Sequence, residues 1–221
     1  MLNGLFVTGT DTGVGKTLVS AALLHRYRHV PELRYWKPVQ TGIEADDDTA
    51  EVLRLAGAAS AQALREGVRL PRPLSPHLSA SLAGTSISLP PLMDLAWAQP
   101  DGDRWIVEGA GGVLVPLNDR ELMVDLISVL GLPAVIAARS GLGTINHTLL
   151  TIEALRARAI PIAGVVMVGA RNPDNRVAIE TRGHVPVIGE LPRLEPFTPE
   201  ALQQAAEGIA RGGELDALLG G

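Results

Sequence analysis

The 221-residue sequence contains no cysteine, and aromatic residues make up only 3% of it. The absence of cysteine excludes disulfides, iron–sulfur ligation and cysteine-based zinc sites, and it agrees with a reducing cytoplasm, the location we expect. With so few aromatic residues, the core has to be built mainly from Val, Leu, Ile and Ala. Such a core is typical of a parallel sheet that is covered by helices.

Long apolar runs and a strong charge of one sign are also missing. No stretch approaches about 18 apolar residues without a charge, so we expect no membrane-spanning segment. The N-terminus has no basic region, and its apolar run is too short for a signal peptide. The formal net charge of -5 argues against nucleic acid as the main partner. Hydrophobic residues nevertheless make up 46% of the chain, enough for one sizeable core, and we expect a single domain over residues 1–221.

Short apolar runs alternate with segments of helical periodicity. The predicted strands are Leu5–Thr8, Tyr35–Trp36, Trp105–Glu108, Ala134–Ala138, Ile162–Val168 and Val185–Gly189. The predicted helices are Thr17–His29, Thr49–Ala56, Leu122–Leu130, Ile145–Ala157 and one from Pro199. The regions predicted to be irregular are the loop Pro71–Pro76, the turn Gly109–Gly112 and a frayed end at Gly212–Gly213 and Gly220–Gly221. This alternation predicts an α/β fold in which helices flank both faces of a mostly parallel central sheet.

A phosphate-binding loop follows the first predicted strand. The run Gly9–Thr17, GTDTGVGKT, fits the pattern G-x-x-x-x-G-K-[ST], with the required strand before it and helix after it. Its glycines let successive backbone N–H groups point at phosphate oxygens, and the helix adds the positive end of its dipole. Lys16 is expected to reach the β- and γ-phosphates, and the Thr17 hydroxyl to ligate Mg²⁺. The loop predicts a P-loop NTPase, but it does not define the reaction.

Charged and polar side chains also stand at the ends of other predicted elements. Lys37 follows a short strand, where it either faces a ligand crevice or is a solvated surface lysine. Glu108 ends another predicted strand. It is either an acidic Mg²⁺ ligand, by analogy with P-loop enzymes, or a solvated carboxylate before a turn. The acids of Asp46–Asp48 either cap a helix or contribute a metal ligand. Near the start of a later helix, Thr144 or Asn146 either caps that helix or binds a ligand carboxylate.

Taken together, these segments resemble the dethiobiotin synthetase family, the ATP-dependent carboxylases of biotin synthesis. The resemblance covers most of the chain in the family's order. The matching segments are GTDTGVGKT, KPVQTG, the acid run, LSPHLSA, VEGAGG, LGTINH and GELP. KPVQTG and VEGAGG together are far more specific than the P-loop. The resemblance implies that 7,8-diaminononanoate, CO₂ and ATP react, through a carbamate and a carbamic–phosphoric anhydride, to dethiobiotin, ADP and phosphate.

The resemblance also implies a role for each matching residue. Lys16 and Lys37 would be the catalytic lysines, which offset the charges of γ-phosphate and carbamate together with Mg²⁺. The implied metal ligands are Thr17, Asp48 and Glu108. The implied nucleotide-binding residues are Gly13, Val14, Gly15, Lys16, Thr17, Leu18, Asp48, Glu108, Gly109, Ala110, Gly111, Leu191, Pro192 and Arg193. The implied substrate-binding residues are Thr12, Lys37, Thr41, Gly111, Leu142, Gly143 and Asn146.

The resemblance further implies a homodimer whose active site lies at the subunit interface. Leu142, Gly143 and Asn146 of one subunit would reach the substrate's tail carboxylate in the other. The chain departs from the family where Val168–Gly169 replaces an Asn–Asp pair that reads the adenine in some members. Gly13 likewise replaces a Glu found in some members. The base would then be read through the backbone around Leu191–Arg193, or other nucleoside triphosphates would be accepted.

Other functions fit part of these observations. A partition- or division-type switch ATPase is built on a similar sheet, but it usually carries an additional lysine early in the P-loop, where this chain has Thr10, Asp11 and Thr12. Such proteins also often end in an amphipathic membrane helix, whereas Gly213–Gly221 is short and glycine-rich. An amidotransferase-type ligase would bring a glutaminase domain with a catalytic cysteine. A phosphate-binding domain without catalysis would not need the retained lysines and acids.

Overall fold

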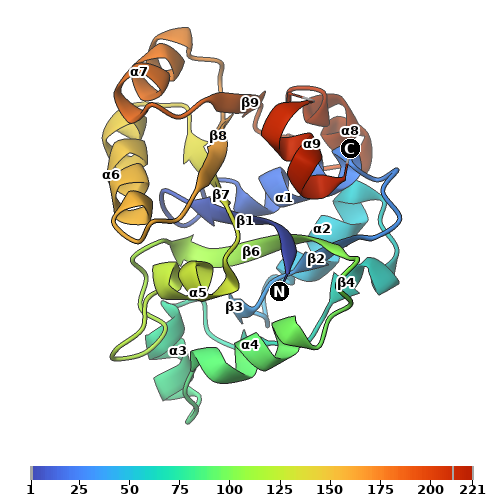
Figure 1. The fold of residues 1–221 in the computed structure, drawn as a ribbon, viewed down its shortest axis with the longest axis vertical. Coiled ribbons are helices and arrows are strands. Elements are labelled where there is room, and N and C mark those ends of the chain that lie inside the picture. Colours follow the sequence, from blue (N-terminus) through green and yellow to red (C-terminus); the bar gives the residue numbers. More distant parts are fainter. Residues whose placement is uncertain (1, 211, 221) are drawn as a thin grey trace.

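The computed structural model describes residues 2–210 and 212–220. Within these residues, seven parallel strands form a central sheet in the order β4-β2-β6-β1-β7-β8-β9 (Figure 1). The strands are β1 (Asn3–Gly9), β2 (Leu33–Trp36), β4 (Ala63–Leu64), β6 (Arg104–Gly112), β7 (Ala134–Arg139), β8 (Ile162–Val168) and β9 (Val187–Leu191). A separate parallel pair joins β3 (Val39–Thr41) to β5 (Val68–Leu70). The predicted parallel sheet is confirmed.

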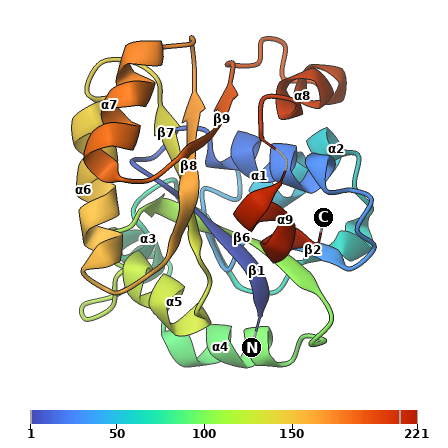
Figure 2. The ribbon, with the colours of Figure 1, turned by 45° about the horizontal axis from the view of Figure 1, so that its top comes forward.

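Helices cover both faces of this sheet, as predicted, and α6 lies beside α7 on one of them (Figure 2). One face carries α3 (Pro76–Leu82), α4 (Leu89–Trp97), α5 (Met123–Leu130), α6 (Thr144–Arg156) and α7 (Pro173–Gly183). The other carries α1 (Lys16–Arg26), α2 (Asp48–Ala56), α8 (Pro199–Ala206) and α9 (Gly213–Leu219). A short 3-10 turn, η1, spans Ser60–Gln62. In the described part of the chain, no helix combines the length and the apolar character needed to cross a membrane.

Two hydrophobic clusters, one on each face, explain why the strands are apolar throughout. In β1, Leu5 and Val7 belong to one cluster, and Phe6 between them belongs to the other. All three side chains are fully buried. A strand that buries both its faces reads as a continuous apolar run. This packing holds β1 in the centre of the sheet, so that the loop after it lies at the middle of the sheet's carboxyl edge.

The prediction of a turn at Gly109–Gly112 was wrong, because β6 continues to Gly112. Gly112 pairs with Gly9 of β1 after an irregularity in the register. A Cβ at Gly109 would lie only 2.8 Å from Cε1 of Phe6. The glycine therefore permits close packing of neighbouring strands and does not reverse the chain. In consequence, Glu108 lies inside the strand and not at its end.

The prediction of a frayed C-terminal end was wrong for the described residues 212–220. The segment Gly213–Leu219 forms α9, and Leu215 and Leu219 are buried against the sheet. The two leucines are four residues apart and therefore share one helical face. Burial of this face holds the short helix in place although glycines flank it. The part of the prediction that concerned Gly221 lies outside the described residues.

Besides α9, three helices of the described chain were absent from the sequence-based prediction, and each of the three has proline in its first turn. These helices are α3, α4 and α7. Proline interrupts a helix interior, but its fixed φ and its missing N–H suit the first turn. The predicted loop Pro71–Pro76 accordingly ends at Ser75, because Pro76 is already the first residue of α3. Other boundaries differ by a few residues: α1 ends at Arg26, and β9 runs two residues later than predicted.

Candidate functional site

The phosphate-binding loop connects β1 to α1 and lies at the carboxyl edge of the sheet. Gly15 precedes the helix with φ 101°, in the left-handed region. A Cβ at this position would also lie 3.0 Å from Cγ1 of Val168 on β8. Both observations require glycine here. The N–H groups of the first turn of α1 therefore open toward the space above the loop, as an anion site requires.

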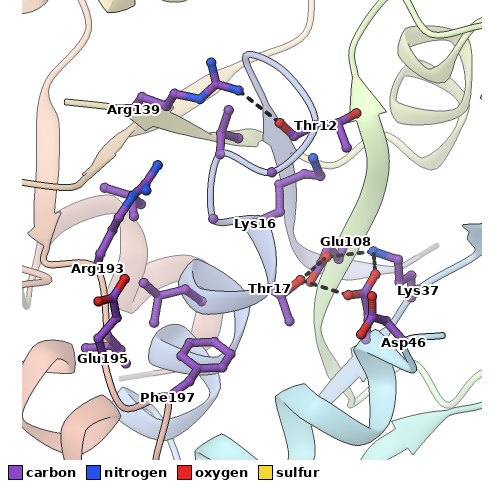
Figure 3. A pocket seen from close by; sticks show the side chains of 17 residues that line it. Thr12, Lys16, Thr17, Lys37, Asp46, Glu108, Arg139, Arg193, Glu195 and Phe197 are labelled. Atoms are coloured by element: carbon purple, nitrogen blue, oxygen red, sulfur yellow. Dashed lines mark hydrogen bonds and ion pairs between the residues drawn. The ribbon is translucent and has the colours of Figure 1, made fainter. Parts of the chain in front are cut away.

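A cavity of about 490 Å³ lies over this loop. The residues that line it and were predicted from the sequence are Thr12, Gly13, Val14, Gly15, Lys16, Thr17, Leu18, Lys37, Asp48, Glu108 and Arg193. Asp46, of the predicted acid run, also lines the cavity. Lining residues that were not predicted as site residues are Arg139, Val168, Leu194, Glu195 and Phe197. Figure 3 shows Thr17, Glu108 and Lys37 on one side of this cavity, with Arg193, Glu195 and Phe197 on the opposite side.

Lys37 is the centre of a buried charge cluster. Its Nζ lies 2.6 Å from Oδ2 of Asp48 and 2.7 Å from Oε1 of Glu108. Lys37 is 3% exposed and Glu108 is 0% exposed, so the alternatives of a solvated lysine and a solvated glutamate are wrong. Burial lowers the pKa of Lys37, but the carboxylates of Glu108 and Asp48 outweigh it, and the net shift is upward. The ammonium is therefore held in its charged form.

The hydroxyl of Thr17 joins the same two carboxylates. It donates to Oδ1 of Asp48 over 3.1 Å and lies 3.3 Å from Oε1 of Glu108. Three oxygens from α1, α2 and β6 thus converge at one point. The other oxygen of Glu108, Oε2, accepts a hydrogen bond of 3.0 Å from the phenol of Tyr35 on β2. Sequence reasoning did not identify Tyr35, which lies in β2 two residues before Lys37, the residue that directly follows this strand.

Lys16 has different surroundings from Lys37. Its Nζ donates to the backbone carbonyl of Asp11 over 3.0 Å, within the phosphate loop itself. Burial lowers the pKa of Lys16 to about 8, although the Glu108 carboxylate acts in the opposite direction. A buried ammonium whose only hydrogen-bond partner in the described chain is a neutral carbonyl gains much from an anion nearby. Lys16 is therefore poised for a phosphate group.

The acid run Asp46–Asp48 divides its two predicted roles between neighbouring residues. The side chain of Asp47 accepts a hydrogen bond from the backbone N–H of Ala50 and caps α2. Asp48 turns into the cavity toward Lys37 and Thr17. The backbone carbonyl of Asp46 accepts a hydrogen bond of 2.6 Å from the buried Gln40 on β3. The cap therefore orients the helix, and the next residue supplies the carboxylate.

Arg139 ends β7 and also reaches the phosphate loop. Its Nη2 lies 3.1 Å from Oδ2 of Asp11 and 3.2 Å from the carbonyl oxygen of Thr12. Sequence reasoning missed Arg139, although it follows a predicted strand, at the edge where ligands of open parallel sheets bind. The guanidinium places a further positive charge at the rim of the cavity.

A second cavity of about 370 Å³ lies on the other side of the loop. It shares Thr12 with the first cavity, and the apolar side chains of Val113, Leu114 and Val115 form part of its wall. His147 and Leu150 of α6 complete one wall. The two cavities together form a bipartite site in which a charged part adjoins an apolar part.

Several predicted site residues lie outside the first cavity. Gly109, Ala110 and Gly111 belong to β6, Thr41 ends β3, Leu191 is buried in β9, and Pro192 borders neighbouring hollows of the surface. Leu142, Gly143 and Asn146 are exposed at the start of α6. Neither Thr144 nor Asn146 caps this helix, because Gly143 is its N-cap residue.

The residues around Thr17 suit a magnesium ion that arrives with a nucleotide. Among residues 2–210 and 212–220, no group of three or more His, Cys, Asp or Glu side chains is arranged to hold a metal ion. The site instead offers one hydroxyl and two carboxylates, from Thr17, Asp48 and Glu108. Mg²⁺ keeps several waters and binds through one or two carboxylates plus substrate phosphates. The donor set therefore fits Mg²⁺ bound to phosphate.

Comparisons with known proteins agree with this geometry. The chain matches the family described as "AAA domain" over residues 3–201. It is 50% identical to an "ATP-dependent dethiobiotin synthetase BioD" of Agrobacterium fabrum over 203 residues, which cover 90% of each chain. It is 46% identical to the protein of the same name from Brucella melitensis over 220 residues, which cover 100% of this chain and 99% of the relative.

Solved structures of the same fold come from more distant proteins. A ParA family ATPase of Chlorobium tepidum superposes with a TM-score of 0.57 at 12% identity, covering 99% of this chain and 96% of the other. The septum site-determining protein MinD of Pyrococcus horikoshii superposes with a TM-score of 0.58 at 15% identity, covering 93% of each chain. These likenesses show the P-loop fold alone. The two sequence relatives, by contrast, match at 50% and 46% identity over nearly the full length, and the chain therefore belongs to the dethiobiotin synthetase family.

Proposed function

We propose that this protein is an ATP-dependent dethiobiotin synthetase, which closes the cyclic urea of dethiobiotin from 7,8-diaminononanoate, CO₂ and ATP. The observation that carries the proposal is the pair of lysines, Lys16 and Lys37, at one phosphate-binding cavity. One lysine lies on the phosphate loop and the other at the buried carboxylates. A switch ATPase of the partition type is not favoured, because its likeness to this chain is limited to the fold.

The proposed reaction joins two anions and therefore needs positive charge around them. One amine of the substrate adds to CO₂ and loses a proton, which gives a carbamate. A carbamate oxygen attacks the γ-phosphorus of ATP, and ADP leaves. The second amine then attacks the carbamoyl carbon, the ring closes, and phosphate leaves with the oxygen that attacked phosphorus. Cations that lie at the approach of carbamate to γ-phosphate stabilise the transition state more than the separated reactants.

Two lysines provide this charge from opposite sides. Lys16 binds the β- and γ-phosphates, where its ammonium exchanges the Asp11 carbonyl for phosphate oxygens. Lys37 serves the carbamate. Its Nζ lies between the two carboxylates, so it has to leave them in order to contact the carbamate. Because the site has few groups that react covalently, positioning of the reactants supplies most of the catalysis.

We infer that Thr17, Asp48 and Glu108 hold Mg²⁺ together with the nucleotide. The ion supplies positive charge to the phosphate oxygens and offsets the two carboxylates when bound. Lys37 then no longer has to neutralise Asp48 and Glu108. Loading of the nucleotide site would in this way release the Lys37 ammonium toward the carbamate.

The diamine substrate has an alkyl chain between its amines and its carboxylate, and the second cavity suits such a chain. Its apolar side chains include Val113, Leu114 and Val115, and it meets the first cavity at Thr12. We propose that Thr12 and Thr41 contact the amine-bearing end. The exposed residues Leu142, Gly143 and Asn146 would contact the carboxylate of a substrate bound to the partner subunit of a homodimer.

The nucleobase would lie at the far side of the first cavity, near Val168, Leu194 and Phe197. None of these three side chains carries an amide that could read the base. We therefore propose recognition through the backbone of residues 191–193, with acceptance of other nucleoside triphosphates as the alternative. The absence of cysteine fits a reducing cytoplasm, which is the location that we propose.

Phosphate release tests the proposed function. Purified protein is mixed with Mg-ATP and bicarbonate, with and without 7,8-diaminononanoate, and phosphate is followed over time. The proposal predicts release that depends on the diamine, together with dethiobiotin in the mass spectrum. Phosphate release at the same rate without the diamine would overturn the proposal and would favour a switch ATPase.

A further inference from the structure

Tyr35 is a buried residue beside the site, and the roles of the phosphate loop and the two lysines do not explain why a tyrosine stands there. It lies in β2, next to the strand β6 that carries Glu108. Its phenol donates a hydrogen bond of 3.0 Å to Oε2 of Glu108. Both residues are 0% exposed. The contact is therefore a phenol–carboxylate pair in the dry interior of the protein, where a lost hydrogen bond cannot be replaced by bulk water.

We propose that Tyr35 is a positioning residue that fixes the Glu108 carboxylate for the magnesium–nucleotide complex. The inference rests on the proposed function, because it assumes that Glu108 faces this complex. Oε1 of Glu108 faces Lys37 and Thr17, at 2.7 Å and 3.3 Å. Oε2 faces away from them, toward Tyr35. The phenol thus fixes the rotation of the carboxylate and keeps Oε1 directed into the site.

Among the residues that the structure describes, Tyr35 is the only side chain that donates to Oε2 of Glu108. If the phenol were lost, Oε2 would have no side-chain donor among these residues, and only the contacts of Oε1 would hold the carboxylate. Burial, and after it the Glu108 carboxylate, raises the pKa of Tyr35 well above its usual value. The phenol consequently stays protonated and acts as a donor at neutral pH. Groups that orient metal ligands in this manner typically change metal affinity about 10–100-fold when they are removed.

The variant Tyr35→Phe removes the hydroxyl and keeps the ring. The ring packs within the cluster on the α1 and α2 face of the sheet, so the variant keeps its packing and loses one hydrogen bond. A matched control exists in Tyr27, which is 1% exposed and donates to Oδ1 of Asp216 over 2.7 Å. Tyr27 follows the last turn of α1, whereas the phosphate loop precedes its first turn. Tyr27→Phe therefore deletes the same kind of hydrogen bond far from the site.

The readout is ADP binding by calorimetry across a series of Mg²⁺ concentrations, with the unfolding free energy of each variant measured in parallel. The Mg²⁺ concentration that gives half of the full gain in ADP affinity should rise about 10-fold or more in Tyr35→Phe. In Tyr27→Phe it should equal the wild-type value, although both variants lose stability. A Tyr35→Phe protein with the wild-type Mg²⁺ dependence would overturn the positioning role and leave Tyr35 with a structural one.

Failure of the proposed function gives a different pattern. If the wild-type protein bound ADP with no dependence on Mg²⁺, the magnesium–nucleotide site itself would be wrong, and with it the role of Tyr35. If the wild type shows the dependence and Tyr35→Phe retains it unchanged, only the positioning role is wrong. The binding measurement uses no diamine and no turnover, so it does not require the carboxylation reaction to be correct.

Discussion

Replacement of Lys37 by methionine should destabilise the ligand-free protein strongly, and Mg²⁺ should restore much of the loss. Methionine keeps a similar length and removes the charge. In the native protein the Lys37 ammonium lies 2.6 Å from Asp48 and 2.7 Å from Glu108. The Asp48 side chain is 29% exposed and can regain water, whereas Glu108 is fully buried. Removing one partner of a buried ion pair typically costs about 3–5 kcal/mol, because the other charge stays buried and unpaired.

Urea unfolding in the presence of ADP, followed by circular dichroism with and without Mg²⁺, measures this effect. Without Mg²⁺, the unfolding free energy of Lys37→Met should be about 3–5 kcal/mol below that of the wild type. A metal ion at 100 times its Kd adds about 2.7 kcal/mol to the stability of a protein that binds it only when folded. The gain should be larger in the variant than in the wild type, because in the wild type Mg²⁺ has to displace the Lys37 ammonium from Asp48 and Glu108.

Lys16→Met is the matched control. Lys16 is also buried, but its Nζ bonds a backbone carbonyl and not a carboxylate. Burial lowers the pKa of Lys16, which means that its charge opposes folding at neutral pH, so its removal should not lower stability and should raise it. Equal stability losses in the two variants, or equal gains from Mg²⁺ in Lys37→Met and wild type, would refute the account of the charge cluster. Lys37→Met should also bind nucleotide but show no turnover.

The remaining predictions concern three other parts of the molecule. Asp47→Ala should lower stability by about 0.5–2 kcal/mol through the lost cap and leave Mg²⁺-dependent ADP binding unchanged, whereas Asp48→Asn should weaken that binding; the reverse pattern in calorimetry would contradict the division of roles. Leu219→Ala should cost about 2–5 kcal/mol in urea unfolding, because this side chain of α9 is fully buried, and a loss below about 0.5 kcal/mol would mean that α9 is not packed as described. Asn146→Ala should raise the KM for the diamine more than that for ATP in steady-state kinetics, and an unchanged diamine KM would exclude its role at the substrate carboxylate.

Much of the site was predictable because its residues lie in short segments with strong local patterns. The phosphate loop needs only a strand, glycines and a helix in sequence, and Gly9–Thr17 supplies all three. The strands were predictable because both faces of a central parallel strand are apolar, as in Ile162–Val168, whose bounds the prediction gave correctly. Lys37 and Glu108 came from the same reasoning, since residues near the carboxyl ends of parallel strands meet at one edge.

Other features depend on packing between distant segments. The glycines after Glu108 predicted a turn, because the sequence does not show that Phe6 lies against Gly109. The prolines of Pro71–Pro76 indicated a loop, although Pro76 begins α3, because a proline alone does not show whether a helix follows it. The helices α4 and α7, which also have proline in the first turn, were not predicted. Tyr35 has the apolar neighbours of a core residue, and only the register of β2 against β6 brings its phenol to Glu108.

The fate of a carbamate oxygen tests the central claim most directly. The protein is given Mg-ATP, the diamine and freshly dissolved ¹⁸O-labelled bicarbonate, and the released phosphate is analysed by mass spectrometry at early times. If the phosphate loop holds ATP for attack by a carbamate oxygen, each phosphate formed from labelled CO₂ carries one ¹⁸O, and the urea carbonyl of dethiobiotin carries the other. Unlabelled phosphate beside labelled dethiobiotin would contradict the account, because ATP would then have been cleaved by water and not by the carbamate.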